Sequence, residues 1–148
     1  MMFINTGATP HIPDIPGIRT TPGVYTSTGL MDVDELPQRL VIIGAGFIGL
    51  EFASMFADFG TAVTVLQHSD EFLPREDEDV AAAIRAQLES QGVRFLFGAD
   101  TKAITSADDG IRLSVSMRAR RTSAPKRVCA CPPTRCWWPP DARRTSRA

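Results

Sequence analysis

Cysteine is absent from the first 128 residues of this 148-residue chain, because all three cysteines lie near its end, at Cys129, Cys131 and Cys136. Most of the chain therefore has no thiols for the disulfide framework that holds small secreted domains together. No apolar run approaches the roughly 18 residues that a membrane-spanning helix needs. The first residues also lack the basic and apolar segments of a signal peptide. These absences predict a cytoplasmic protein that has no membrane partner.

Basic residues are scarce over most of the chain and concentrated at its end. Residues 1–117 contain seven Lys and Arg against sixteen Asp and Glu, which gives a net charge of −9. Residues 118–148 contain nine basic residues and one acidic residue, Asp141, which gives a net charge of +8. Such an abrupt reversal predicts a terminal segment with a different role or origin from the acidic body. The length allows one domain with a core, but not two.

The chain before position 39 is rich in Pro, Gly and Thr, whereas apolar runs and helical patterns alternate after it. Four prolines between positions 10 and 22 remove backbone donors and fix φ, so residues 1–38 are expected to form an extended connector. Buried parallel strands are predicted at three short apolar runs, 40–43, 62–66 and 93–97. Two weaker strands, 101–105 and 111–116, flank a turn and predict a hairpin. The pattern indicates an α/β fold.

Two helices are predicted between the parallel strands, and a glycine follows each of them. The first helix leaves the 44–49 segment and extends to about Asp58. The second is predicted over residues 75–91, and its first turn contains four consecutive acidic residues, 76–79, where the helix dipole favours negative charge. The apolar residues expected on its buried face, spaced four apart, are Val80, Ile84 and Leu88.

The glycines of Gly44-Ala45-Gly46-Phe47-Ile48-Gly49 have the GxGxxG spacing of a dinucleotide-binding loop. The motif alone is weak evidence, but here it lies between a predicted strand and a predicted helix, in a β–α–β unit of the expected length. Gly44 would permit the tight turn, Gly46 would let the backbone approach a pyrophosphate, and Gly49 would let the helix pack closely on the strand. The amides of Phe47 and Ile48, at the helix start, would then face the phosphates.

The end of the second strand is where such folds contact the adenosine ribose, usually through Asp or Glu. This chain has Gln67 there, which can hydrogen-bond a ribose hydroxyl without repelling a 2′-phosphate. Asp70 and Glu71 follow closely, and their charge disfavours a phosphate, so NAD is slightly preferred over NADP. The next residue, His68, either reaches the adenosine end or is a solvated loop residue, and the second interpretation is preferred.

The 41–60 segment reads VIIGAGFIGLEFASMFADFG, and it resembles the NAD(P)H-binding motif of the flavoprotein disulfide reductases, the class I pyridine nucleotide-disulfide oxidoreductases. INTGATPHIPDIPGI resembles the segment that leaves the FAD domain of that family. TTPGVYTSTGLMDVDELP and EFLPREDEDVAAAI are most similar to its bacterial reactive-chlorine-resistance branch, beside mercuric reductase and dihydrolipoamide dehydrogenase. The resemblance covers residues 1 to about 116 and implies a Rossmann-like domain.

The resemblance implies roles for individual residues. The turn Thr6-Gly7-Ala8 would lie against FAD. Phe47 takes the position of a side chain that shields the nicotinamide pocket, although it could instead be a core residue. Glu51 matches a carboxylate near the nicotinamide, although it could instead lie on a solvated helix face.

The same resemblance implies a division of the chain and of the activity. Residues 1–22 would be a connector from an FAD domain, residues 23–116 the NAD(P)H-binding domain, and residues 117–148 an irregular basic tail. In the family, the redox cysteine pair precedes this region and the dimer domain with the catalytic His follows it. We therefore expect no catalytic residue in this chain, no retained FAD and no turnover by the chain alone. The full-length family is homodimeric. The alternative is a non-catalytic nucleotide-binding module with a basic interaction tail.

The basic tail has three interpretations. Cys129-x-Cys131-x4-Cys136 offers only three thiols, without a nearby His, whereas zinc sites need four ligands, so no metal is expected. The basic run with Trp137 and Trp138 could bind nucleic acid without sequence specificity, and this is also disfavoured. The preferred interpretation is that the coding frame is shifted.

The genetic code supports a frameshift. Read from one base earlier, Cys136-Trp137-Trp138-Pro139 must encode Leu-Val-Ala. Codons permitted for the flanking residues complete Ala-Asp-Ala-Val-Leu-Val-Ala-Thr-Gly-Arg-Ala-Pro-Asn, which resembles the strand that follows the hairpin in the family. The shift would begin between about Ser116 and Lys126, and sequencing the coding DNA tests it. The lost strand would pair beside the 40–43 strand, so a missing last strand, an exposed edge and a marginally folded, aggregation-prone chain are expected.

Overall fold

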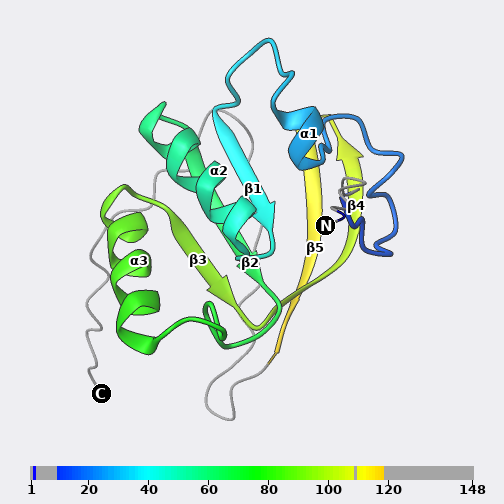
Figure 1. The fold of residues 1–148 in the computed structure, drawn as a ribbon. Coiled ribbons are helices and arrows are strands. Elements are labelled where there is room, and N and C mark those ends of the chain that lie inside the picture. Colours follow the sequence, from blue (N-terminus) through cyan, green and yellow to red (C-terminus); the bar gives the residue numbers. More distant parts are fainter. Residues whose placement is uncertain (1, 3–9, 109, 119–148) are drawn as a thin grey trace, which may run out of the picture.

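The computed structural model describes residue 2, residues 10–108 and residues 110–118, which form an α/β fold with two sheets (Figure 1). The strands are β1 Arg39–Ile43, β2 Ala62–Gln67, β3 Arg94–Phe97, β4 Ala99–Ala107 and β5 Gly110–Met117. The helices are α1 Ser27–Leu30, α2 Phe47–Asp58 and α3 Glu78–Ser90. Strands β1, β2 and β3 are parallel and adjacent in that order, and β4 and β5 form an antiparallel hairpin. The predicted Rossmann-like α/β class is confirmed.

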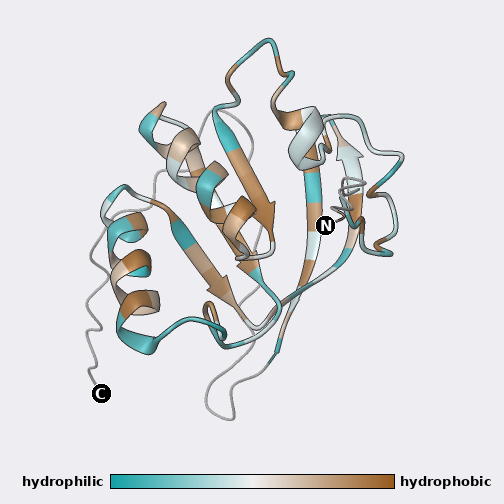
Figure 2. Cartoon of the chain, in the orientation of Figure 1, coloured by the Kyte–Doolittle hydropathy of each residue, from teal (hydrophilic) through white to brown (hydrophobic). Residues whose placement is uncertain are grey.

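The parallel sheet is built from two β–α–β units, and its central strand is the most buried. In β2, Val63 and Val65 are 2% and 0% exposed, because neighbouring strands pair with it on both sides and α2 packs on it. This position explains the nearly continuous apolar run of the 62–66 segment, which is typical of strands covered on both faces. Figure 2 shows the same apolar character along β1 and β3.

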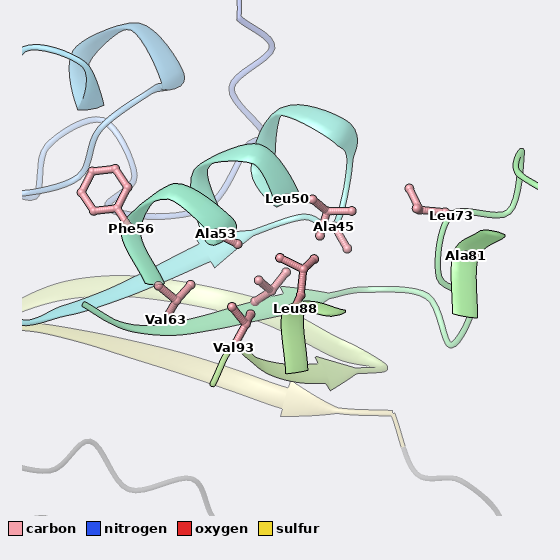
Figure 3. Close-up of a cluster of buried hydrophobic side chains, with 10 residues drawn as sticks. Ala45, Leu50, Ala53, Phe56, Val63, Leu73, Ala81, Leu88 and Val93 are labelled. Carbon is pink, nitrogen blue, oxygen red and sulfur yellow. The ribbon is translucent and has the colours of Figure 1, made fainter. Parts of the chain in front are cut away.

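The hydrophobic core lies between this sheet and its helices (Figure 3). From α2 it receives Leu50, Ala53 and Phe56, which recur at helical spacing on the face toward the sheet. Helix α3 adds Ala81 and Leu88. The prediction for the buried face of α3 is correct at Leu88, but wrong at Val80, whose side chain is 43% exposed.

Helix α3 begins at Glu78, three residues later than the sequence pattern predicted. The cause lies in the preceding residues. Leu73 has a φ of +47°, and the Glu76 N–H donates to the Leu73 carbonyl at 3.0 Å, so a tight turn precedes the helix. Asp77 is the N-cap residue, and only Glu78 and Asp79 of the acidic run lie in the first turn. Ala81 rather than Val80 faces the core, because Ala81 precedes Ile84 and Leu88 by three and seven residues and therefore lies on the same helix face.

The connector before β1 is not wholly extended, since it contains the short helix α1 and packs against the hairpin. The Ile104 N–H donates to the Pro16 carbonyl at 2.9 Å. Gly17 has a φ of +86°, and a Cβ atom added to it would lie 1.9 Å from the Ile104 carbonyl oxygen. Only glycine can occupy such a position without moving the backbone. The hairpin strands are also longer than predicted.

Strand β1 forms one edge of the described three-stranded sheet. Val41 and Ile43 on this strand are 42% and 40% exposed. The predicted additional strand beside β1 falls on residues outside the described part of the chain. Among the described residues, no helix combines the length and apolarity required to cross a membrane.

Candidate functional site

The glycine-rich loop lies where β1 ends and α2 begins, at the carboxyl edge of the parallel sheet (Figure 1). Strands β1 and β2 are in register up to the pair Ile43 and Leu66. One residue later, the Gly44 N–H donates to the Leu66 carbonyl at 2.8 Å. Gly44 then has a φ of +103°, which turns the chain out of the sheet and into the helix. In open α/β sheets, ligands bind at this edge.

The other two glycines of the loop differ in what surrounds them. A Cβ atom on Gly49 would lie 2.6 Å from the Gly44 carbonyl oxygen and 3.2 Å from the Ile42 side chain, so this glycine permits the close packing of α2 on the loop. A Cβ atom on Gly46 would meet no heavy atom within 4 Å. The absence of a side chain at Gly46 therefore does not relieve crowding inside the protein. It leaves the backbone approachable from outside.

Helix α2 presents its first turn to this open space. Gly46 is its N-cap residue, with an extended φ and ψ of −81° and 170° and no side-chain cap. Phe47 and Ile48 are 58% and 59% exposed, although both are large and apolar. Glu51 is also exposed, one turn further along the helix. Phe47 is therefore not a core residue within the described part of the chain.

A pocket of about 210 Å³ lies beside the loop. Ala45, Gly46, Phe47 and Gln67 line one part of it, and the 73–76 turn lines the rest. The sequence indicated the first group but missed the turn, which contributes Arg75 and Glu76 to the lining. The Leu-Pro pair at 73–74 was the available signal, since a residue before proline is disfavoured in the helical region.

Gln67, the last residue of β2, forms hydrogen bonds with both ends of its side-chain amide. Its Oε1 accepts from the Ala45 N–H at 3.0 Å. Its Nε2 donates to the Ser69 Oγ at 2.8 Å, with a longer contact of 3.4 Å to the Glu71 carbonyl. Ser69 in turn donates to the same Glu71 carbonyl at 2.9 Å. Gln67 thus connects the glycine loop to the loop after β2.

His68 does not line the pocket, and its side chain contacts the hairpin instead. The Arg118 guanidinium donates to the His68 Nε2 at 3.0 Å, which places the ring proton of a neutral His68 on Nδ1. That Nδ1 lies 3.6 Å from the Asp100 carboxylate. A hydrogen bond from Lys102, which also forms an ion pair with Asp100, lowers the pKa of the Asp100 carboxyl.

Two further groups of predicted residues lie outside the described part of the chain: the Thr6-Gly7-Ala8 turn and the cysteines of the tail. Within the described residues there is no cluster of three or more His, Cys, Asp or Glu side chains that could hold a metal ion. The site therefore consists of the loop, the first turn of α2, the end of β2 and the 73–76 turn. This set of backbone amides with an open approach suits a phosphorylated ligand.

Known proteins resemble most of this chain in sequence. Residues 1–130 match a family model described as pyridine nucleotide-disulphide oxidoreductase. The probable pyridine nucleotide-disulfide oxidoreductase RclA of Escherichia coli K12 is 51% identical over 112 residues, which cover 76% of this chain and 25% of that protein. The dihydrolipoyl dehydrogenase of Bacillus subtilis is 38% identical over 116 residues, covering 75% and 24%.

A solved structure has the same fold. The HOCl-induced flavoprotein disulfide reductase RclA from Escherichia coli superposes with a TM-score of 0.72 at 50% identity, over 74% of this chain and 25% of that chain. This chain therefore spans about a quarter of the length of these relatives.

Proposed function

The chain belongs to the pyridine nucleotide-disulphide oxidoreductase family, and we propose that it forms the NAD(P)H-binding portion of a flavin-dependent member. Members of this family are FAD- and NAD(P)H-dependent flavoproteins. Because the chain spans only about a quarter of the length of its relatives, the activity of the whole enzyme is also a proposal. In that enzyme, hydride would pass from NAD(P)H to the flavin, and the reduced flavin would then pass electrons to a disulfide or metal acceptor.

The open backbone at Gly46 is the observation that carries the proposal. A pyrophosphate would fit there, because no heavy atom lies within 4 Å of the Cβ position and α2 begins at this residue, so its free first-turn amides would be within reach. Exposed Phe47 and Ile48 would cover the dinucleotide beyond the phosphates, and Glu51 would lie toward its nicotinamide end. When bound, the dinucleotide supplies the hydride. The residues of this chain bind and orient the dinucleotide.

Nucleotide choice depends on the end of β2 and the 73–76 turn. Gln67 carries no charge, so it cannot repel a 2′-phosphate as the usual carboxylate does. Asp70 and Glu71 disfavour the additional phosphate, whereas Arg75 in the pocket lining favours it. We therefore propose that the site accepts both nucleotides with a slight preference for NAD. The same proposal includes a cytoplasmic location and a division of the chain into a connector, residues 1–22, and the binding domain, residues 23–116.

Titration with NADH tests the proposal, with a matched pair of glycine variants. The full chain should bind NADH, and Gly46→Ala should weaken binding about tenfold or more, because a methyl group would occupy the phosphate approach. Its stability should fall by no more than about 1 kcal/mol, since that methyl meets no protein atom and Ala is only a poorer N-cap residue than Gly. Gly29→Ala, in α1, should leave NADH affinity unchanged. Absence of NADH binding by the folded chain would overturn the proposal.

Flavin analysis separates this function from that of an independent enzyme. The purified chain should contain no stoichiometric FAD and should not oxidise NADH. The Thr6-Gly7-Ala8 turn alone is not expected to retain the flavin. Bound FAD that is reduced by NADH would contradict this part of the proposal. Binding of NADH without flavin would agree with a portion that binds only the dinucleotide.

A further inference from the structure

The side chain of Gln67 extends the pairing of β1 and β2 into the glycine loop. The last backbone hydrogen bond of this ladder joins the Gly44 N–H to the Leu66 carbonyl. The next amide, of Ala45, has no strand to pair with because the chain has turned toward α2. Its partner is the Gln67 Oε1, which lies 3.0 Å away and comes from a residue 22 positions later. Ala45 is itself 5% exposed and packs in the core.

The hydrogen bonds around Gln67 form a directed relay. The Ala45 N–H donates to Gln67, Gln67 donates to Ser69, and Ser69 donates to the Glu71 carbonyl. Each group is polarised by the one before it, which strengthens chains of this kind. The relay requires an acceptor and a donor on one uncharged side chain. A glutamate at this position would keep the acceptor and lose the donor, and a leucine would lose both.

We propose that Gln67 is a positioning residue, which holds the glycine loop in its phosphate-binding conformation before the ligand arrives. This inference rests on the proposed dinucleotide function and assigns Gln67 a role other than direct contact with the ribose. Because Ala45 is fixed at one end of the loop and Gly49 packs tightly at the other, the open backbone at Gly46 is held between two anchored points. A loop ordered in advance loses less conformational freedom when it binds.

The first measurement is hydrogen exchange at the Ala45 amide in the full 148-residue chain without nucleotide. Gln67→Leu should speed exchange at Ala45 about tenfold, because the amide loses its acceptor. Gln67→Glu should rescue most of this protection, because a carboxylate still accepts from the Ala45 N–H and can also accept from the Ser69 hydroxyl, which would hold it in place. Ser69→Ala should give an intermediate rate, since it breaks the relay and leaves Gln67 in place. It also provides the comparison if Gln67→Leu does not fold.

Gln91→Leu is the matched control. Gln91 also uses both ends of its amide, accepting from the Ser54 Oγ at 3.3 Å and donating to the Asp58 carboxylate at 3.0 Å. These bonds join α3 to α2 away from the pocket, so this variant should leave exchange at Ala45 unchanged. If Gln67→Leu sped exchange at Ala45 only by lowering the stability of the whole chain, Gln91→Leu would speed it equally.

The second measurement is NADH affinity in the same variants. Gln67→Leu should weaken NADH binding about 5- to 10-fold, the value of one neutral hydrogen bond used in ordering the loop. Gln67→Glu should remain within about threefold of wild type for NADH, while its charge should disfavour NADPH. Unchanged exchange at Ala45 in Gln67→Leu would overturn the positioning role, even if NADH binds. If the protection of the Ala45 amide depends on Gln67 but the chain binds no NADH, the result would instead refute the proposed function.

Discussion

The parallel unit, which consists of β1–β3 with α2 and α3, and the hairpin of β4 and β5 are stabilised in different ways. The parallel unit has its own core, in which β2 is covered by strands on both sides and by α2 on one face. In the hairpin, β4 buries Ala99, Thr101 and Ile104, whereas no residue of β5 is fully buried. The hairpin obtains part of its cover from the connector, through the close contact of Gly17 with Ile104.

This difference indicates which region can support a ligand site. A loop that must hold backbone amides in fixed positions needs rigid elements on both sides, and the glycine loop has β1 and α2. The hairpin contributes no residue to the pocket lining and meets the site region through the charged contacts of His68. We therefore expect damage to the parallel unit to affect folding as a whole, and damage to the hairpin to remain local.

The largest expected effect is that of Phe56→Ala in the parallel unit. Phe56 is 3% exposed and packs against Phe52 and Phe59, so its removal leaves a cavity in the core. The free energy of unfolding, measured by urea denaturation, should fall by about 3–5 kcal/mol. Phe59→Ala is the control, because Phe59 is 61% exposed and its loss should have a small effect. Equal effects of the two substitutions would contradict the assignment of the core.

A smaller and local effect is expected from Gly17→Ala. The added methyl would overlap the Ile104 carbonyl, so the connector must separate from β4. We expect a loss of about 2–3 kcal/mol, from the clash and from the positive φ together. Hydrogen exchange should increase at the amides of β4 and β5 and change little in β2.

Gly92→Ala separates the two contributions to the Gly17 effect. Gly92 has a similar φ of +90°, but a Cβ atom there meets nothing within 4 Å. Only the backbone strain of about 1–2 kcal/mol should therefore remain. If both variants lose the same stability, the contact between the connector and the hairpin contributes nothing.

The smallest expected effect is that of Asp100→Asn, at the charged contact between the two regions. Because the hydrogen bond from Lys102 lowers the pKa of Asp100 below its usual 3.8 in the folded chain, ionised Asp100 stabilises the fold above that pH. The stabilisation should disappear as the pH falls through the folded pKa. Since the Asp100 side chain is still 37% exposed, the difference in unfolding free energy from wild type should be small at neutral pH and should shrink in high salt.

Asp108→Asn is the matched control for this pH dependence. Asp108 is exposed at the hairpin turn, away from His68 and Lys102. Its substitution should give no comparable difference between neutral and acid pH. A difference for Asp100→Asn that grows on acidification would show that the sign of the predicted linkage is wrong.

Much of the parallel unit could be predicted because its signals are local. The apolar runs identified β1, β2 and β3 to within one residue, and the glycine spacing identified the loop and the start of α2. The error at α3 has a local cause as well. The acidic run and the helical spacing of Val80 favoured an early start, but the positive φ of Leu73 before Pro74 produced a turn. Helix α1 was missed because it has only four residues.

The contacts of the site residues could not be predicted in the same way. Gln67 was expected at the ribose, and its bond to Ala45 depends on how β1 and β2 align. His68 lies in sequence beside Gln67, yet its partner Arg118 is 50 residues away on the hairpin. Gln67 is the last residue of β2 and His68 the first residue of the loop after it, so the strand pairing does not fix where the His68 side chain lies.

The sequence by itself determined the α/β order, the glycine loop and the acidic body with its basic end. These features depend on the spacing and charge of residues close together in the chain, and both can be read directly from the sequence. Only the tertiary structure decided that the Gly46 backbone is open, that Arg75 and Glu76 border the pocket and that Gln67 holds Ala45. Each of these depends on segments distant in sequence being brought together by burial of the core, and local patterns do not specify that geometry.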